Sequence, residues 1–253
     1  MSPQFVIVVA ILMGAVIGSF LNVVIVRLPR NESLVAPRSR CPLCGAELHW
    51  FDNIPLLSFL ALRGRCRNCG GPISWRYPIV EAATALAFAL AAWRTPPTAD
   101  LLVAWFFLAA LVAVTAIDLE HQIIPDLITL PGILLGFVTS FLGTRVSWVD
   151  SLLGILAGGG ILFAVVVLSG GGMGGGDMKL GAMMGAFLGY KLALLALFLA
   201  AILGGVVALG LLSTGIRRRK DPIPFGPFLA IAAAVAMLWG ETILTWYLRV
   251  FSL

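Results

Sequence analysis

The 253-residue sequence is short of charge. Only 11% of its residues are charged and 60% are hydrophobic, whereas a soluble globular domain carries about 25% charged residues. This composition excludes an ordinary soluble protein and indicates a multispanning membrane protein, because each spanning helix needs roughly 20 mostly apolar residues. The sequence also lacks a soluble basic domain of any size. We therefore interpret its net charge of +5 as an orientation signal and predict no binding to nucleic acid.

The amino-terminal apolar run lacks the features of a cleavable signal peptide. Residues 6–26 exceed a typical h-region, no basic n-region precedes them, and Arg27 follows without a small-residue cleavage site. We expect a retained first span in an all-α polytopic membrane protein with about eight transmembrane helices. The predicted spans are 5–26, 78–94, 99–117, 124–143, 150–169, 178–190, 192–213 and 225–249.

The sixth and seventh spans are predicted from one apolar stretch, residues 180–212, interrupted only by Gly189, Tyr190 and Lys191. A stretch of about 33 residues exceeds one bilayer crossing, which favours two spans, although a single tilted helix also fits the pattern. Basic residues predict that both termini lie outside. In that orientation all of the 17 basic residues fall in inside loops except four, namely Arg94, Arg145, Lys191 and Arg249. A basic cluster at 217–220 contributes to this bias.

All four cysteines lie in the one sizeable hydrophilic segment, residues 28–77. CPLC at 41–44 and CRNC at 66–69 have the spacing of a tetrahedral four-thiolate zinc site, with ligands Cys41, Cys44, Cys66 and Cys69. Gly45 and Gly70 follow the pairs, where a tight knuckle often needs positive φ. The predicted zinc is structural because four thiolates leave no open position. Two disulfides or redox motifs are the alternative, which an inner-face, reducing compartment disfavours. His49 is the only other candidate ligand in this segment, and we interpret it as a surface residue.

Carboxylates in or beside the apolar runs are functional candidates, because an ionisable group is expensive at membrane depth. A carboxylate in the first turn of a helix is favoured by the helix dipole. This accounts for Asp126, which follows Pro125, and for Glu81 near the start of the second span. Glu120 is interpreted as solvated and Glu241 as a structural hydrogen-bond partner.

Asp118 and Asp177 differ from the other carboxylates because both fall at the inner ends of predicted spans, at one depth. Two carboxylates that meet there share a proton and carry out aspartic-protease chemistry. The glycine run 170–176, which precedes Asp177, lets a substrate strand approach closely because it has no Cβ atoms. The alternative is a flexible loop whose aspartate caps a helix.

Several segments resemble the bacterial type IV prepilin peptidases, which are GxGD intramembrane aspartyl proteases. They are GSFLNVVIVRLP at 18–29, the cysteine segment 41–81, AIDLEHQIIPDLITLP at 116–131 and GGGDMKLGAMMGAFLG at 174–189. They occur in order, from the first span to at least residue 190. In this resemblance Asp118 and Asp177 match the two catalytic aspartates, and the four cysteines match the zinc ligands.

The resemblance implies a bifunctional enzyme of the bacterial inner membrane. It would cut the basic leader from prepilins and pseudopilins of type IV pili or type II secretion, at the cytoplasmic face. It would then methylate the new amino terminus with S-adenosylmethionine. No Rossmann-type glycine fingerprint marks a donor site, and 50–66 is our candidate for that region. The expected parts are 1–27, a first transmembrane helix; 28–77, a cytoplasmic zinc domain; and 78–253, a seven-helix protease domain.

Two other functional classes fit the same composition. A proton-coupled transporter with a structural zinc loop would use the carboxylates as a relay, but it would spread them through the membrane and favour repeated halves, and the sequence has no internal repeat. A membrane scaffold that presents the zinc loop to a cytosolic partner would need none of these carboxylates.

Overall fold

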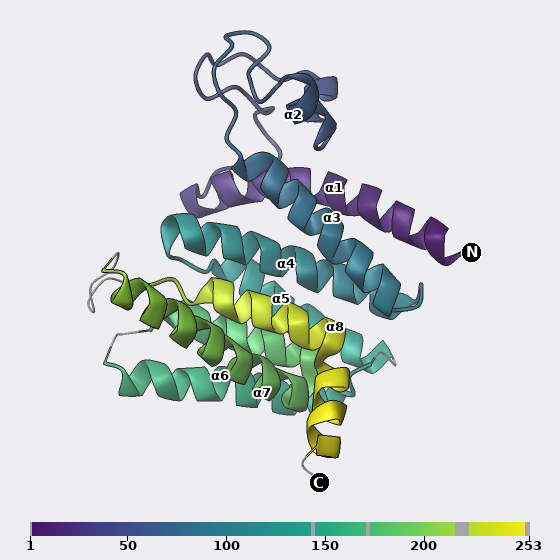
Figure 1. Ribbon diagram of the computed structural model, residues 1–253, viewed down its shortest axis with the longest axis vertical. Helices are drawn as coiled ribbons and strands as arrows, with labels where there is room; N and C mark the ends of the chain where they lie inside the picture. The colour runs from purple at the N-terminus through teal and green to yellow at the C-terminus, as the bar shows by residue number, and fades with distance from the viewer. Residues whose placement is uncertain (1, 143–144, 171–172, 216–222, 251–253) are drawn as a thin grey trace. The chain divides into compact units, whose positions relative to one another are not determined.

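The computed structural model describes residues 2–142, 145–170, 173–215 and 223–250. In this part of the chain there are eight α-helices, α1 to α8, and three short 3₁₀ helices, η1 to η3 (Figure 1). The all-α prediction is therefore confirmed. The chain divides into two compact units, Met1–Ala116 and Ile117–Leu253. The predicted basic cluster at 217–220 lies outside the described residues.

The elements follow one another in a simple order. They are α1 (Pro3–Arg27), η1 (Leu28–Arg30), η2 (Trp50–Asn53), α2 (Leu57–Ala61), α3 (Arg76–Arg94), α4 (Ala99–His121), α5 (Asp126–Thr139), η3 (Ser140–Leu142), α6 (Trp148–Leu168), α7 (Gly175–Ser213) and α8 (Gly226–Val250).

Among the described residues, five stretches are long and apolar enough to cross a membrane: α1 with η1, α4, α6, α7 and α8. Two helices lie where further spans are predicted and differ from these five. α3 has 19 residues, but it begins and ends with arginine and contains Glu81. α5 has only 14 residues, so it is about 21 Å long.

The predicted sixth and seventh spans both fall within α7, whose 39 residues run from Gly175 to Ser213. The helix is broken at Gly189, where φ is 71° and ψ is 171°. Glycine adopts such angles without the steric cost that a Cβ atom brings. α7 is therefore two helical segments joined at the position where the sequence predicts an interruption.

In the first unit, small residues bring α1 and α3 into backbone contact (Figure 1). A Cβ atom on Gly14 would lie 2.6 Å from Ala85 Cα, and one on Gly18 would lie 2.7 Å from Glu81 Cα. The four-residue spacing places both glycines on one helix face, as in the small-residue interfaces of membrane helices. The indole of Trp105 on α4 donates to the Phe88 carbonyl at 3.1 Å, which joins α4 to α3.

In the second unit, α6 and α7 pack through a similar contact of glycine against glycine. Gly154 and Gly158 of α6 face Gly185 and Gly181 of α7, and a Cβ on any of the four would overlap the opposing backbone or side chain. Ser151 adds a buried hydrogen bond to the Ala186 carbonyl at 2.9 Å. These contacts position the first half of α7, which begins with Asp177 in its first turn.

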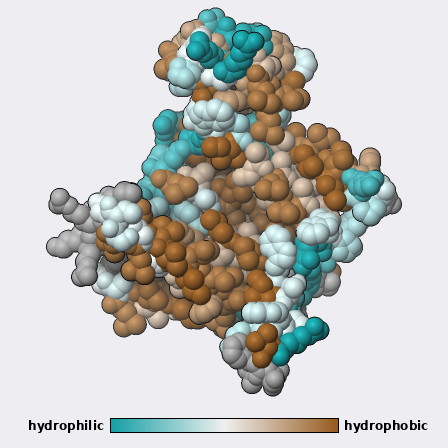
Figure 2. All heavy atoms as spheres, in the orientation of Figure 1, coloured by the Kyte–Doolittle hydropathy of each residue, from teal (hydrophilic) through white to brown (hydrophobic). Residues whose placement is uncertain are grey.

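Large apolar side chains remain exposed along the long helices, which fits a membrane environment. Brown, hydrophobic atoms cover much of the helical surface in Figure 2, whereas teal, hydrophilic atoms gather over the segment between α1 and α3. Exposed examples include Phe20 on α1, Leu134 on α5, Phe163 on α6 and Phe198 on α7. The structure and composition together describe a multi-pass membrane protein with one polar segment.

The α6–α7 contact predicts that Gly185→Ala destabilises the protein, because the new Cβ would overlap the Gly154 carbonyl. Overpacking of this kind typically costs about 1–3 kcal/mol, which should lower the unfolding temperature measured in detergent. Gly160→Ala on α6 is the matched control, since its Cβ would meet nothing within 4 Å. Equal unfolding temperatures for Gly185→Ala and the unaltered protein would contradict this description of the interface.

Candidate active site and metal centre

Asp118 lies in the last turn of α4 and is only 5% exposed. Its Oδ2 accepts a hydrogen bond from the backbone N–H of Gly226, the first residue of α8, at 3.0 Å. A helix amino terminus carries unpaired N–H groups and a partial positive charge, so it stabilises a carboxylate placed against it. The start of α8 therefore holds one oxygen of Asp118 in a defined position.

Asp177 lies in the first turn of α7 and is 8% exposed. Its backbone N–H donates to the Gly174 carbonyl at 3.2 Å. Its side-chain Oδ1 is buried and has no hydrogen-bond partner in the part of the chain that the structure describes. A buried polar atom without a partner is costly, so this oxygen is available to a proton, a water molecule or a substrate.

The two aspartates belong to one site in the second unit. Their charges lie close enough to repel each other. Ile124, in the turn between α4 and α5, lies next to residues beside both aspartates. Cβ atoms built on Gly176, which precedes Asp177, and on Gly226, which binds Asp118, would lie 2.9 Å and 3.2 Å from the Ile124 side chain. The structure thus brings together in one unit two carboxylates that are far apart in the sequence.

Gly226 is a site residue that the sequence analysis missed. A Cβ there would lie 2.6 Å from Asp118 Oδ2, so a larger residue would displace the carboxylate. The local signal is a glycine between Phe225 and Pro227 at a helix start, which by itself indicates only a turn and a helix boundary. Its role depends on the hydrogen bond to Asp118, which is 108 residues away in the sequence.

The other predicted carboxylates occupy different surroundings. Asp126 is the first residue of α5, and Lys179 Nζ lies 2.7 Å and 2.6 Å from its two oxygens. This pair is partly exposed and joins α5 to α7. Glu120 lies 3.9 Å from the imidazole of His121, and Glu241 is exposed. None of these three is buried as Asp118 and Asp177 are.

Glu81 is buried and contacts the polar segment of its own unit. Its Oε2 accepts the backbone N–H of Leu56 at 2.8 Å, and the Ser19 hydroxyl also donates to it. The sequence attributes the presence of Glu81 to its position near a helix start. The structure shows that this position accounts for only part of its environment. No local pattern predicts the contact, because Leu56 and Glu81 are 25 residues apart.

The four cysteines form one cluster that is able to bind a metal. Their sulfur atoms all lie within 4.8 Å of one another, and Cys41 Sγ and Cys69 Sγ are 3.9 Å apart. Thiolates bound tetrahedrally to zinc at about 2.3 Å lie about 3.8 Å from each other, so the donor set and its dimensions fit that ion. All four cysteines are free thiols. His49 is exposed and is not part of the cluster.

Each cysteine pair sits in the same tight turn. Antiparallel bridges join Arg40 to Glu47 around the first pair and Arg65 to Pro72 around the second. The N–H of Gly45 donates to the Cys41 carbonyl, and that of Gly70 to the Cys66 carbonyl, each at 2.9 Å. Both glycines have positive φ, 72° and 69°, as the sequence predicts.

Backbone and side-chain N–H groups prepare the sulfurs for a cation. Donors from Ala46 and Asn68 lower the pKa of the Cys44 thiol to about 6. The Gly71 N–H lowers the pKa of the Cys69 thiol. Burial and the neighbouring cysteines outweigh this effect and raise that pKa to about 11. Four adjacent thiols cannot all ionise without a positive charge among them, and a metal ion supplies that charge.

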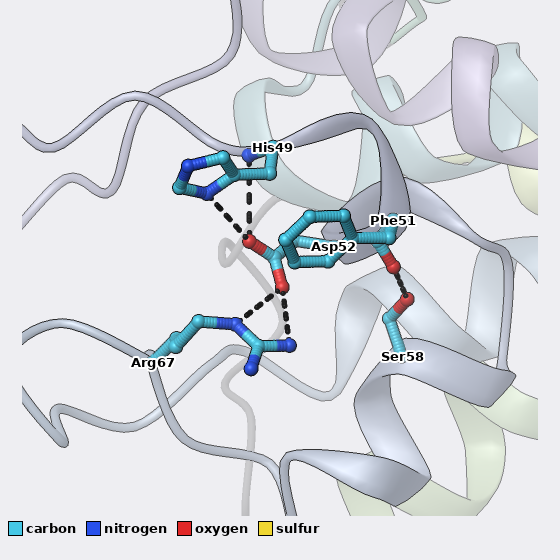
Figure 3. Close-up of polar contacts among 5 residues, drawn as sticks. All are labelled: His49, Phe51, Asp52, Ser58 and Arg67. Carbon is cyan, nitrogen blue, oxygen red and sulfur yellow. Dashed lines mark hydrogen bonds and ion pairs between the residues drawn. The ribbon is translucent and has the colours of Figure 1, made fainter.

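Asp52 ties the second cysteine pair to η2 (Figure 3). Its side chain is only 5% exposed and accepts hydrogen bonds from the His49 backbone at 3.3 Å and from Arg67 Nε at 2.9 Å. Burial by itself would raise the pKa of Asp52, but the bonds from Arg67 and His49 outweigh it and lower that pKa. Since Arg67 lies inside the CRNC turn, Asp52 joins the metal cluster to residues 49–53.

Comparison with known proteins identifies two matching regions. Residues 12–95 match the model of the bacterial peptidase A24 N-terminal domain, and residues 105–209 match that of the type IV leader peptidase family. No solved structure matches the chain.

Whole-chain relatives agree with these matches. The chain is 38% identical to the prepilin leader peptidase/N-methyltransferase of Pseudomonas aeruginosa, over 98% of this chain and 95% of that protein. It is 40% identical to the enzyme of that name from Aeromonas hydrophila, over 95% and 93%. A Bacillus subtilis relative of the same name is 33% identical, over 93% and 95%. The resemblance seen in the aspartate and cysteine segments thus extends through the whole sequence, and the chain belongs to the type IV prepilin leader peptidase/N-methyltransferase family.

Proposed function

We propose that this protein is an intramembrane aspartic endopeptidase that removes the leader from type IV prepilins and pseudopilins, with Asp118 and Asp177 as its catalytic pair. The observation that carries the proposal is the meeting of these two buried carboxylates at neighbouring helix ends. The whole-length similarity to prepilin leader peptidases supports the same reaction. It also supports a second step, methylation of the new amino terminus.

The catalytic pair works by sharing one proton. Two carboxylates this close cannot both be ionised, so one is protonated and the other is charged. The charged carboxylate takes a proton from water, whose oxygen attacks the peptide carbon, while the protonated carboxylate polarises the peptide carbonyl. The C–N bond then breaks, the nitrogen receives a proton, and a carboxylate and an amine are released. The Gly226 N–H holds Asp118 throughout.

Substrate approach is favoured by the glycines that precede Asp177. A Cβ on Gly175 would meet nothing within 4 Å, and one on Gly174 would meet the Asp177 carboxylate at 3.6 Å. Backbone without side chains therefore lies directly beside the Asp177 carboxylate. An extended peptide fits there, because its main chain can approach closely where no side chains intervene.

For the membrane arrangement we propose eight crossings, with α3, α5 and the two halves of α7 added to the four other long helices. Basic residues then place both termini outside and the aspartates at the cytoplasmic face of the bacterial inner membrane. A prepilin has a basic leader followed by an apolar helix, so it would insert with its cleavage junction at that face. We retain the division into residues 1–27, 28–77 and 78–253.

For the metal we propose a structural Zn²⁺ bound by the four cysteines. Four thiolates complete a tetrahedron and leave no position for a catalytic water. The free thiols and the N–H groups aimed at them support a bound cation over disulfides. The ion would stabilise both cysteine turns and, through Arg67 and Asp52, the segment that follows η2.

For the second step we propose S-adenosylmethionine as the methyl donor. The donor would supply the methyl group of its sulfonium to the amine released by cleavage, with the donor's thioether as the leaving group and loss of a proton from the nitrogen. Residues 50–66 remain our candidate region, because they lie beside α3 near the membrane face.

Substitution of either catalytic aspartate should abolish cleavage. Asp118→Asn and Asp177→Asn remove a carboxylate that must exchange a proton, so we expect losses of at least about 10²–10⁴-fold in kcat, measured with a model prepilin and detergent-solubilised protein. Asp126→Asn is the control, since Asp126 is exposed and paired with Lys179. Normal cleavage by either catalytic variant would refute the assignment.

Gly226→Ala should impair catalysis without changing the cleavage position. Its Cβ would push Asp118 from the N–H that holds it, and we expect about a 10–100-fold lower kcat, the effect of losing about 1.4–2.7 kcal/mol of positioning. Gly205→Ala on α7 is the control, because its Cβ would meet nothing within 4 Å. An unchanged kcat for Gly226→Ala would show that this contact is dispensable.

Metal removal should loosen the four-cysteine segment and leave the helices intact. Purified protein should contain one zinc per chain, and its extraction by a chelator should make residues 28–77 sensitive to protease, because metal binding and folding are coupled in such sites. Helix content by circular dichroism is the control. If loss of zinc is verified and protease resistance is unchanged, the structural role is wrong.

A further inference from the structure

The polar segment between α1 and α3 contains a nine-residue apolar stretch without charge. Residues 54–62, IPLLSFLAL, lie between Asp52 and Arg63 and include α2. Brown atoms cover part of this otherwise hydrophilic segment in Figure 2. The cysteine cluster and the aspartate pair do not account for this apolar stretch, which we call the 54–62 segment.

The 54–62 segment is attached to the side of the α1–α3 pair. Its Leu56 N–H donates to Glu81 of α3 at 2.8 Å, and Ser19 of α1 donates to the same carboxylate. The Glu81 backbone in turn contacts Gly18 of α1. Leu56 has φ of 62°, in the region that favours glycine, so the chain takes an unfavourable turn to make this contact.

The point of attachment lies well inside the membrane end of these helices. Gly18 is nine residues before Arg27, or about 13.5 Å along α1, and Glu81 is five residues after Arg76, or about 7.5 Å along α3. The Arg27 guanidinium donates to loop carbonyls of Ser33 and Pro37, which marks the polar end of α1. Interfacial helices bury their apolar faces about 5–10 Å below the headgroups. In the membrane arrangement proposed above, Glu81 lies within this range and Gly18 lies deeper, so the attachment falls at or below the acyl boundary.

The backbone of the 54–62 segment is prepared for an apolar environment. The first N–H groups of a helix usually point to water, but here Leu56 donates to Glu81, Leu57 to the Pro55 carbonyl and Ser58 to the Ile54 carbonyl. The Ser58 hydroxyl donates to the Phe51 carbonyl at 2.7 Å. Backbone at membrane depth needs such partners, because no water is there to supply them.

The two faces of α2 differ. Phe59 packs against Trp75, with ring centroids 4.9 Å apart, and attaches the helix to the start of α3. Leu57 and Leu60, three residues apart on another face, are 65% and 69% exposed. Arg63 and Arg65 follow directly, where basic side chains are attracted to anionic headgroups.

We propose that the 54–62 segment is embedded in the cytoplasmic leaflet, with Leu57 and Leu60 in contact with lipid acyl chains and Glu81 as its anchor. The occupant of the exposed face is therefore a lipid surface. Depth, the hydrogen bonds made by the first N–H groups of the segment and the lack of charge favour lipid over a protein partner. The proposal rests on the membrane arrangement proposed above but not on peptidase chemistry, so it can fail while the proposed cleavage reaction stands.

The test uses photocrosslinking in the full-length protein. Leu57 or Leu60 is replaced by a photoreactive diazirine amino acid, and the protein is reconstituted in vesicles of phosphatidylethanolamine and phosphatidylglycerol. After irradiation, mass spectrometry should find lipid adducts at both positions. The control is the same substitution at Val35, which is 91% exposed in the same polar segment and should give only solvent adducts. Solvent adducts alone at 57 and 60 would overturn the proposal, as would adducts only to a second protein chain.

The anchoring role of Glu81 is tested in the same preparation. Glu81→Gln retains an acceptor for the Leu56 N–H and should leave the lipid adducts at position 57 in place. Glu81→Ala removes the acceptor and should cause loss of those adducts, since the unpaired N–H would draw the segment toward water. Helix content and lipid adducts at exposed Phe20 on α1 verify that the variants are folded and inserted. Equal adduct yields for the two variants would refute Glu81 as the anchor.

Discussion

Buried carboxylates among apolar helices impose the main constraint on this structure, because an ionised group without a partner is costly in such surroundings. Asp118 and Glu81 meet the constraint in the same way, each with a backbone N–H from a distant part of the chain. Asp177 does not, since one of its oxygens has no partner among the described residues. An unsatisfied oxygen beside a second carboxylate is unfavourable for stability, and it is what proton exchange with a substrate requires.

Glycine makes these contacts geometrically accessible. Backbones approach within contact distance between α1 and α3, through Gly14 and Gly18, and between α6 and α7, through Gly154 and Gly185. Such packing replaces the hydrophobic driving force, which does not favour helix association in lipid. The same absence of Cβ at Gly226 allows a helix start to reach Asp118. Rigid packing of small residues thereby supports a site that holds two neighbouring carboxyl groups.

Within the first unit, a series of polar contacts leads from the cysteine cluster to the helices. Arg67 in the second cysteine turn binds Asp52, and Ser58 binds the Phe51 carbonyl next to it (Figure 3). Leu56 then binds Glu81 on α3. A metal in the cluster would therefore stabilise more than its own loop, because each contact restricts the segment that carries the next one. This gives a structural metal a physical connection to the membrane-proximal part of the domain.

The sequence by itself determined the features that depend on local pattern. Composition predicted helices, and cysteine spacing predicted the metal cluster with positive φ at Gly45 and Gly70. The ends of the apolar runs singled out Asp118 and Asp177, which are both buried in the structure. Only the tertiary structure decided which groups complete these sites. The Gly226 contact to Asp118 and the Leu56 contact to Glu81 each join residues that are far apart in the sequence, so they depend on how distant segments pack. Hydrophobic periodicity records which residues avoid water, but it carries no information about which backbone N–H will meet which carboxylate after folding.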